Sequence, residues 1–190
     1  MRYVALGDSY TIGTGVQPAE RWPDQLVAAL GPAEPALDLI ANLAVNGYTS
    51  EDLIRHELPS LDATAEFASV LIGVNDVVQG VPPATYAANI AVILDTLLVR
   101  LRPSHLITVA IPDYTVTPAG ADYGDPARRH DAIVAANETM ARCSAERGIA
   151  WVDIFDLSLA AAVADTVYHE IAHHFGISDA RLHALKRGAP

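Results

Sequence analysis

The sequence predicts an α/β fold with a five-stranded parallel sheet and helices on both of its faces. Short apolar runs of strand character alternate five times with polar turns and with longer segments of helical periodicity. Parallel neighbouring strands need crossover connections of this kind, which are almost always right-handed. At 190 residues, the chain is long enough to build one such domain around a sizeable core.

The first half of the chain supplies three of the five strands. These strands are expected over 3–6, 37–41 and 68–72. A helix is expected to begin near Trp22 and to end at Gly31, because Pro23 is tolerated in a first helical turn and glycine often follows a last one. A second helix is expected from Thr49, and Pro59 follows its end.

The second half contains the clearest helix, which follows Pro83 and ends at Pro103. Its apolar residues fall on one face and predict a core stripe: Ile90, Ile93, Leu94, Leu97 and Leu101. Two strands are expected over 105–111 and 149–154, with a helix over 127–147 between them. The long loop over 112–126 either borders a substrate site or only spans a gap.

Charge and cysteine content narrow the range of partners and compartments. Twelve basic against 23 acidic residues give a formal net charge of −11, which argues against nucleic acid as a partner. The single cysteine, Cys143, lies in a helical pattern and is expected to be a buried thiol in a reducing compartment. No apolar run has the length of a membrane-spanning helix, and the first strand leaves no room for a signal peptide. We therefore expect a cytoplasmic protein without a membrane span.

Polar residues follow three of the expected strands. Ser9 comes after the first strand, Gly47 after the second and Asn75 after the third. Because the carboxyl ends of parallel strands meet at one edge of a sheet, we expect these residues to approach one another. Together they suit acyl transfer, with Ser9 as nucleophile. The backbone N–H groups of Ser9 and Gly47 and the side-chain amide of Asn75 would then hold the oxyanion. On its own, the first cluster is more typical of a capped turn.

These clusters resemble the SGNH or GDSL-type serine esterases and lipases, over about residues 2–157. The three blocks that carry the resemblance are Gly7-Asp8-Ser9, Asn42-Leu43-Ala44-Val45-Asn46-Gly47 and Gly73-Val74-Asn75-Asp76. The resemblance implies a flavodoxin-like, three-layer α/β/α sandwich. It also implies hydrolysis of small-molecule carboxylic esters or related acyl groups without a cofactor.

The chain departs from the family's last block, which is an aspartate followed three residues later by the general-base histidine that it orients. No aspartate here has a histidine at that spacing. Asp165 and His169 are four residues apart, and one helical turn or a loop with one extra residue could bring them together. Asp165 and His169 are therefore the provisional orienter and base. Asp179 and His183 share the same separation.

His169 also begins a second motif, His169-Glu170-Ile171-Ala172-His173. On a helix, His169 and His173 share a face and can bind zinc, with Asp179 as a third ligand and Glu170 as general base. This tail resembles the end of a small zincin-type metallopeptidase, but about thirty residues cannot supply the sheet that such an enzyme needs. We therefore expect a hydrolase-like domain over 1–160 and a helical tail over 161–190.

Three functions remain open from the sequence. The first is a serine hydrolase of small or lipid-like esters that needs no cofactor. The second is a zinc-dependent peptidase site formed by His169, His173 and Asp179 in the tail. The third is a protein that keeps the fold and the oxyanion pocket but lacks a working base, so that it binds esters or carboxylates without turning them over.

Overall fold

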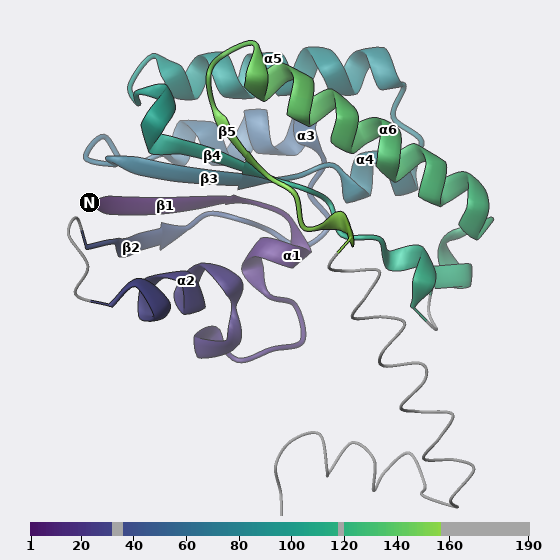
Figure 1. Ribbon diagram of the computed structural model, residues 1–190, viewed down its shortest axis with the longest axis horizontal. Coiled ribbons are helices and arrows are strands. Elements are labelled where there is room, and N and C mark those ends of the chain that lie inside the picture. The colour runs from purple at the N-terminus through teal and green to yellow at the C-terminus, as the bar shows by residue number, and fades with distance from the viewer. Residues whose placement is uncertain (32–35, 118–119, 157–190) are drawn as a thin grey trace, which may run out of the picture.

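The computed structural model describes residues 1–31, 36–117 and 120–156, and its centre is one five-stranded parallel sheet (Figure 1). The strands are β1 (Arg2–Gly7), β2 (Asp38–Asn42), β3 (Phe67–Leu71), β4 (Leu106–Val109) and β5 (Ala150–Val152). They are ordered β2-β1-β3-β4-β5, and each pair of neighbours is parallel. This is the doubly wound, flavodoxin-like order, so the predicted fold class is confirmed.

Helices cover both faces of the sheet. Helix α2 (Trp22–Leu30) lies on one side, and α5 (Pro83–Leu98) and α6 (Pro126–Ala145) lie on the other (Figure 1). The apolar stripe predicted for the α5 region is buried as expected, since Ile90, Ile93, Leu94 and Leu97 are fully covered and Leu101 is 5% exposed. This stripe packs into the main core and is not a binding surface.

Two short helices begin where the sequence predicts only turns. Helix α1 (Ser9–Ile12) starts directly after β1 because the Asp8 carboxylate accepts the Tyr10 N–H at 3.0 Å and so caps it. Helix α4 (Val74–Gln79) starts after Gly73, shortly beyond β3, without a side-chain cap. Both are shorter than two turns, which is too short to leave a periodic apolar pattern in the sequence.

The segment after β2 changes helix type twice. It runs through α3 (Ser50–Asp52), the π-helical turn η2 (Leu53–Glu57) and the 3-10 turn η3 (Leu58–Ser60). The sequence predicts one helix that ends before Pro59, whereas Pro59 lies inside η3. Proline is accommodated at the start of a new turn because its missing N–H would have no partner there. The remaining 3-10 turns are η1 (Pro18–Glu20), η4 (Pro103–His105), η5 (Tyr114–Val116) and η6 (Gly120–Tyr123).

Two further expectations concern Cys143 and the membrane. The thiol of Cys143 is free and buried on α6, with 7% of the residue exposed, as the helical pattern predicts. None of the helices in the described ranges combines the length and hydropathy that a membrane crossing requires.

Candidate active site

Ser9 lies in a tight turn at the carboxyl end of β1. The strand stops at Gly7, whose φ of +148° favours glycine and where a Cβ would lie 2.1 Å from the Leu71 carbonyl oxygen. Asp8 is fully buried and caps α1, so the next residue begins a helix. This turn leaves Ser9 partly exposed at the edge of the sheet, with its backbone N–H in the first helical turn.

Asn75 reaches the same edge from the first turn of α4. Its Nδ2 donates a hydrogen bond to the Tyr48 carbonyl oxygen at 2.9 Å. An amide nitrogen carries two hydrogens, so this bond orients the group and leaves the second N–H for another acceptor. Gly47 precedes Tyr48 in the exposed loop after β2 and has a φ of +86°, with open space where a Cβ would be. The bond therefore joins the residue that follows the second motif block to the third block.

Ser9 and Asn75 line one cavity of about 280 Å³. The other lining residues are Tyr10, Asn46, Val74, Val78, Tyr114 and Tyr123. Gly47 is not among them, although its neighbour Asn46 is. The parallel sheet thus brings two of the three predicted residues into one cavity and places the third beside a lining residue.

Three buried carboxyl groups lie next to the motif blocks, since Asp8 precedes Ser9, Asp76 follows Asn75 and Glu57 accepts the Gly7 N–H. Burial raises the pKa of Asp8 to about 7, and nearby Asp76 acts in the same direction. Burial also raises the pKa of Asp76, against the opposing effect of its hydrogen bonds from Ser50. The pKa of Glu57 is raised by burial to about 8, although the Gly7 N–H donates a hydrogen bond to this carboxyl group. Negative charge is therefore costly directly beneath the Ser9 turn.

An aspartate and histidine pair that the sequence did not predict lies beside the cavity wall. Asp113 immediately precedes the lining residue Tyr114, and its Oδ2 lies 2.6 Å from His130 Nδ1. Asp113 also accepts hydrogen bonds from the N–H and the hydroxyl of Thr115. Burial opposes ionisation of Asp113, but these bonds outweigh it and lower its pKa. The position of Asp113 after β4 could have indicated a functional residue from the sequence. His130 lies 17 residues further on and is brought close to Asp113 only by the packing of α6.

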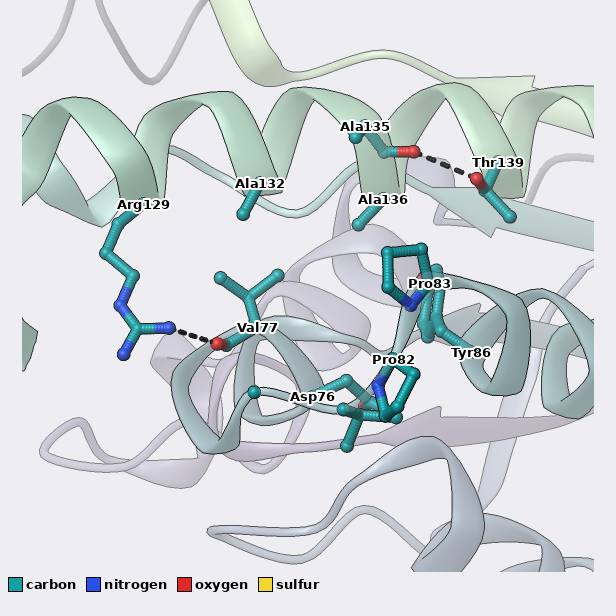
Figure 2. A pocket seen from close by; sticks show the side chains of 12 residues that line it. Asp76, Val77, Pro82, Pro83, Tyr86, Arg129, Ala132, Ala135, Ala136 and Thr139 are labelled. Atoms are coloured by element: carbon teal, nitrogen blue, oxygen red, sulfur yellow. Dashed lines mark hydrogen bonds between the residues drawn. The ribbon is translucent and has the colours of Figure 1, made fainter.

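A second cavity, of about 270 Å³, lies between α4 and α6 (Figure 2). At one end, the Arg129 guanidinium donates hydrogen bonds to the carbonyl oxygens of Val77 and Val78 at the end of α4. Its Nε donates to the Tyr123 carbonyl oxygen at 3.0 Å. Arg129 therefore joins the helix that carries Asn75 to a wall of the first cavity.

The comparison with protein families decides the classification. The GDSL-like lipase/acylhydrolase family matches residues 5–184, which is most of the chain. The chain belongs to this family. The family predicted from the three motif blocks, and with it the class of ester hydrolase, is therefore confirmed. The match also extends beyond residue 157, where the resemblance read from the sequence ends.

Solved structures agree with the fold of this GDSL-like protein. A lipolytic G-D-S-L family protein from Veillonella parvula is 16% identical, with a TM-score of 0.66 over 88% of this chain and 83% of that one. The SGNH-hydrolase esterase AlinE4 is 22% identical, with a TM-score of 0.63 over 100% and 96%. An extracellular lipase from Streptomyces rimosus is 20% identical, with a TM-score of 0.59 over 82% and 81%.

One curated relative shares part of the sequence. An ATP phosphoribosyltransferase from Sinorhizobium fredii is 32% identical over 112 residues, which is 58% of this chain and 47% of that protein. The chain thus spans about half the length of this curated relative.

The remaining candidate residues of this GDSL-like protein lie outside the described residues. They are the proposed general base His169, its orienting residue Asp165, and the further residues of the zinc motif, Glu170, His173 and Asp179. Within the described ranges, no group of three or more histidine, cysteine, aspartate or glutamate residues is arranged to hold a metal ion.

Proposed function

We infer that this protein hydrolyses carboxylic esters of small molecules with Ser9 as its nucleophile. The observation that carries this inference is that Ser9 and Asn75 line the same cavity. The Ser9 hydroxyl oxygen would form a bond to the ester carbonyl carbon and give a tetrahedral oxyanion. The free N–H of the Asn75 amide suits that oxyanion, because the Tyr48 carbonyl already holds the group in place.

Two backbone N–H groups complete the proposed oxyanion hole. Within the described ranges, the N–H groups of Ser9 and Gly47 donate no hydrogen bond, so both are available to a substrate. The lack of a Cβ at Gly47 leaves space for the substrate to approach its backbone. This arrangement supports stabilisation of the charge that develops during acyl transfer.

The proposal assigns the general base to His169 and its orientation to Asp165. His169 would take the proton from the Ser9 hydroxyl and return it to the leaving alcohol, while Asp165 stabilises the imidazolium. A water molecule, deprotonated by the same histidine, would then attack the acyl-enzyme and release the acid. The family match supports this assignment because it extends over both residues.

The cavity favours small esters with an apolar acyl or alcohol group. Its walls combine aromatic rings from Tyr10, Tyr114 and Tyr123 with aliphatic groups from Val74 and Val78. A volume of about 280 Å³ lies near the lower end for small-molecule sites. The names of the similar structures, an extracellular lipase and an esterase, support the same substrate class.

Covalent labelling tests the assignment of the nucleophile. A fluorophosphonate should attach one phosphonyl group per chain, and mass spectrometry should locate it on the peptide that contains Ser9. The Ser9→Ala variant should remain unlabelled, whereas Ser60→Ala, at an exposed serine, should label like the wild type. A label that persists in Ser9→Ala would exclude Ser9 as the reactive serine.

A further inference from the structure

Glu57 is a buried carboxyl group that the proposed chemistry does not use. It ends the π-helical turn η2, and 2% of the residue is exposed. Its Oε2 accepts a hydrogen bond from the Gly7 N–H at 2.9 Å, across 50 residues of sequence. Its Oε1 has no hydrogen-bond partner among the described residues. Single π-helical turns often occur at functional sites, and this one points an acidic side chain beneath the nucleophile turn.

Gly7 is held from both sides. Its N–H donates to Glu57, and its carbonyl oxygen accepts a hydrogen bond from the Val45 N–H at 3.2 Å. Val45 belongs to the loop that also contains Gly47. The end of β1 is thereby fixed between the second motif block and the η2 turn. Ser9 follows two residues later, so its position depends on this anchoring.

The surroundings of Glu57 favour a neutral carboxyl group. Burial raises its pKa to about 8, against the opposing hydrogen bond from Gly7, and the charge of Asp8 raises it further. Asp76 of α4 lies close to Asp8 in turn and raises the pKa of Asp8. Ionisation of Glu57 would therefore add negative charge beside a carboxyl group that already has an acidic neighbour.

We propose that Glu57 is a positioning residue for Ser9, and that its neutral carboxyl group fixes the Gly7-Asp8-Ser9 turn against η2. This inference rests on the proposed role of Ser9. A neutral carboxyl group still offers its carbonyl oxygen to the Gly7 N–H, without the charge repulsion that a carboxylate would meet from Asp8. Loss of the proton places two like charges beneath the nucleophile and displaces the turn. Ester hydrolysis should then slow at alkaline pH, with a midpoint near 8.

Two variants of Glu57 and one control distinguish its role as a hydrogen-bond acceptor from the effect of its charge. Glu57→Gln keeps a carbonyl oxygen for Gly7 but cannot ionise, whereas Glu57→Met removes the acceptor and leaves a buried N–H unpaired. Glu66→Gln is the matched control, because Glu66 accepts the Arg2 N–H at 2.9 Å at the other end of β1 but is exposed. The measurement is kcat for a short-chain p-nitrophenyl ester between pH 6 and 10, with spontaneous hydrolysis subtracted.

We expect Glu57→Gln to keep the wild-type kcat at pH 7 and to lose the alkaline decline. Glu57→Met should lower kcat at least about fivefold with little change in KM. Glu66→Gln should keep the wild-type rate and pH profile. The proposal is overturned if Glu57→Gln declines with the wild-type midpoint, or if Glu57→Met keeps the wild-type kcat. Labelling of Ser9 tests the proposed function separately, since it should be lost in Ser9→Ala and kept in the Glu57 variants.

Stability gives a second readout that needs no activity. A carboxyl group whose pKa is raised by folding contributes stability that is complete below its unfolded pKa and is lost as pH rises to its folded pKa. The Tm of Glu57→Gln minus the Tm of the wild type should therefore increase between about pH 4.5 and 8 and stay constant above pH 8. A Tm difference that does not change with pH would contradict a neutral Glu57.

Discussion

Ser50 donates two hydrogen bonds to Asp76, from its backbone N–H at 2.8 Å and from its hydroxyl at 2.5 Å. Ser50 begins α3 directly after the loop that contains Gly47, and Asp76 follows Asn75 in α4. This pair therefore joins the two segments that carry the proposed oxyanion donors. The spacing of those donors depends on a buried carboxyl group as well as on the sheet.

Removing this link should cost both stability and rate. Asp76→Ala leaves two buried donors of Ser50 without an acceptor, which is expected to lower the free energy of unfolding by about 1–3 kcal/mol. We also expect kcat to fall, because Gly47 and Asn75 lose their fixed spacing. Urea unfolding and ester hydrolysis measure the two effects. Asp95→Ala removes a 63% exposed partner of Arg147 and should change stability by less than about 1 kcal/mol. Equal stability losses in the two variants would contradict this role.

The amide of Asn75 is expected to act on the transition state more than on the bound substrate. Asn75→Ala should lower kcat by about 100- to 1,000-fold, or about 3–4 kcal/mol, with a much smaller change in KM. Steady-state kinetics with a p-nitrophenyl ester measures both constants. Asn46→Ala removes a different amide from the same cavity and should reduce kcat by less than about tenfold. A purely KM effect in Asn75→Ala would remove Asn75 from the oxyanion hole.

Arg129 should support both α4 and the cavity wall. Arg129→Met removes its hydrogen bonds to the carbonyl oxygens of Val77, Val78 and Tyr123. Because this side chain is partly exposed, we expect a loss of stability of about 1–2 kcal/mol and a lower kcat/KM. Its exposed neighbour offers a control, and Arg128→Met should leave stability and kcat/KM close to wild type. Matching effects in the two variants would show that charge matters here and the contacts do not.

Two histidines compete for the role of general base. The account predicts that His169→Ala lowers kcat by at least about 10⁴-fold, because the Ser9 hydroxyl loses its proton acceptor. His130→Ala breaks the contact with Asp113 but should keep kcat within about tenfold of the wild type. Parallel measurements of kcat near pH 8 decide between them. The reverse pattern would assign the base to the pair formed by His130 and Asp113.

The sequence is sufficient for the fold because apolar strand runs and helical periodicity are local signals. It also indicates that Ser9 and Asn75 approach, since parallel strands place their carboxyl ends at one edge. The contact between Glu57 and Gly7 was not predictable, because it spans 50 residues and depends on an extra residue in a π-helical turn. The pair formed by Asp113 and His130 likewise arises from the packing of α6. Short helices such as α4 leave no periodic pattern in the sequence.

Hydrolysis of a short-chain p-nitrophenyl ester by the wild type and by Ser9→Ala, each with and without EDTA, tests the central claim most directly. We predict that the wild type is active, that EDTA leaves its rate unchanged, and that Ser9→Ala falls to the spontaneous rate. Activity that survives in Ser9→Ala but disappears with EDTA and returns with zinc would contradict the serine mechanism. That result would favour the metal site at His169, His173 and Asp179 instead.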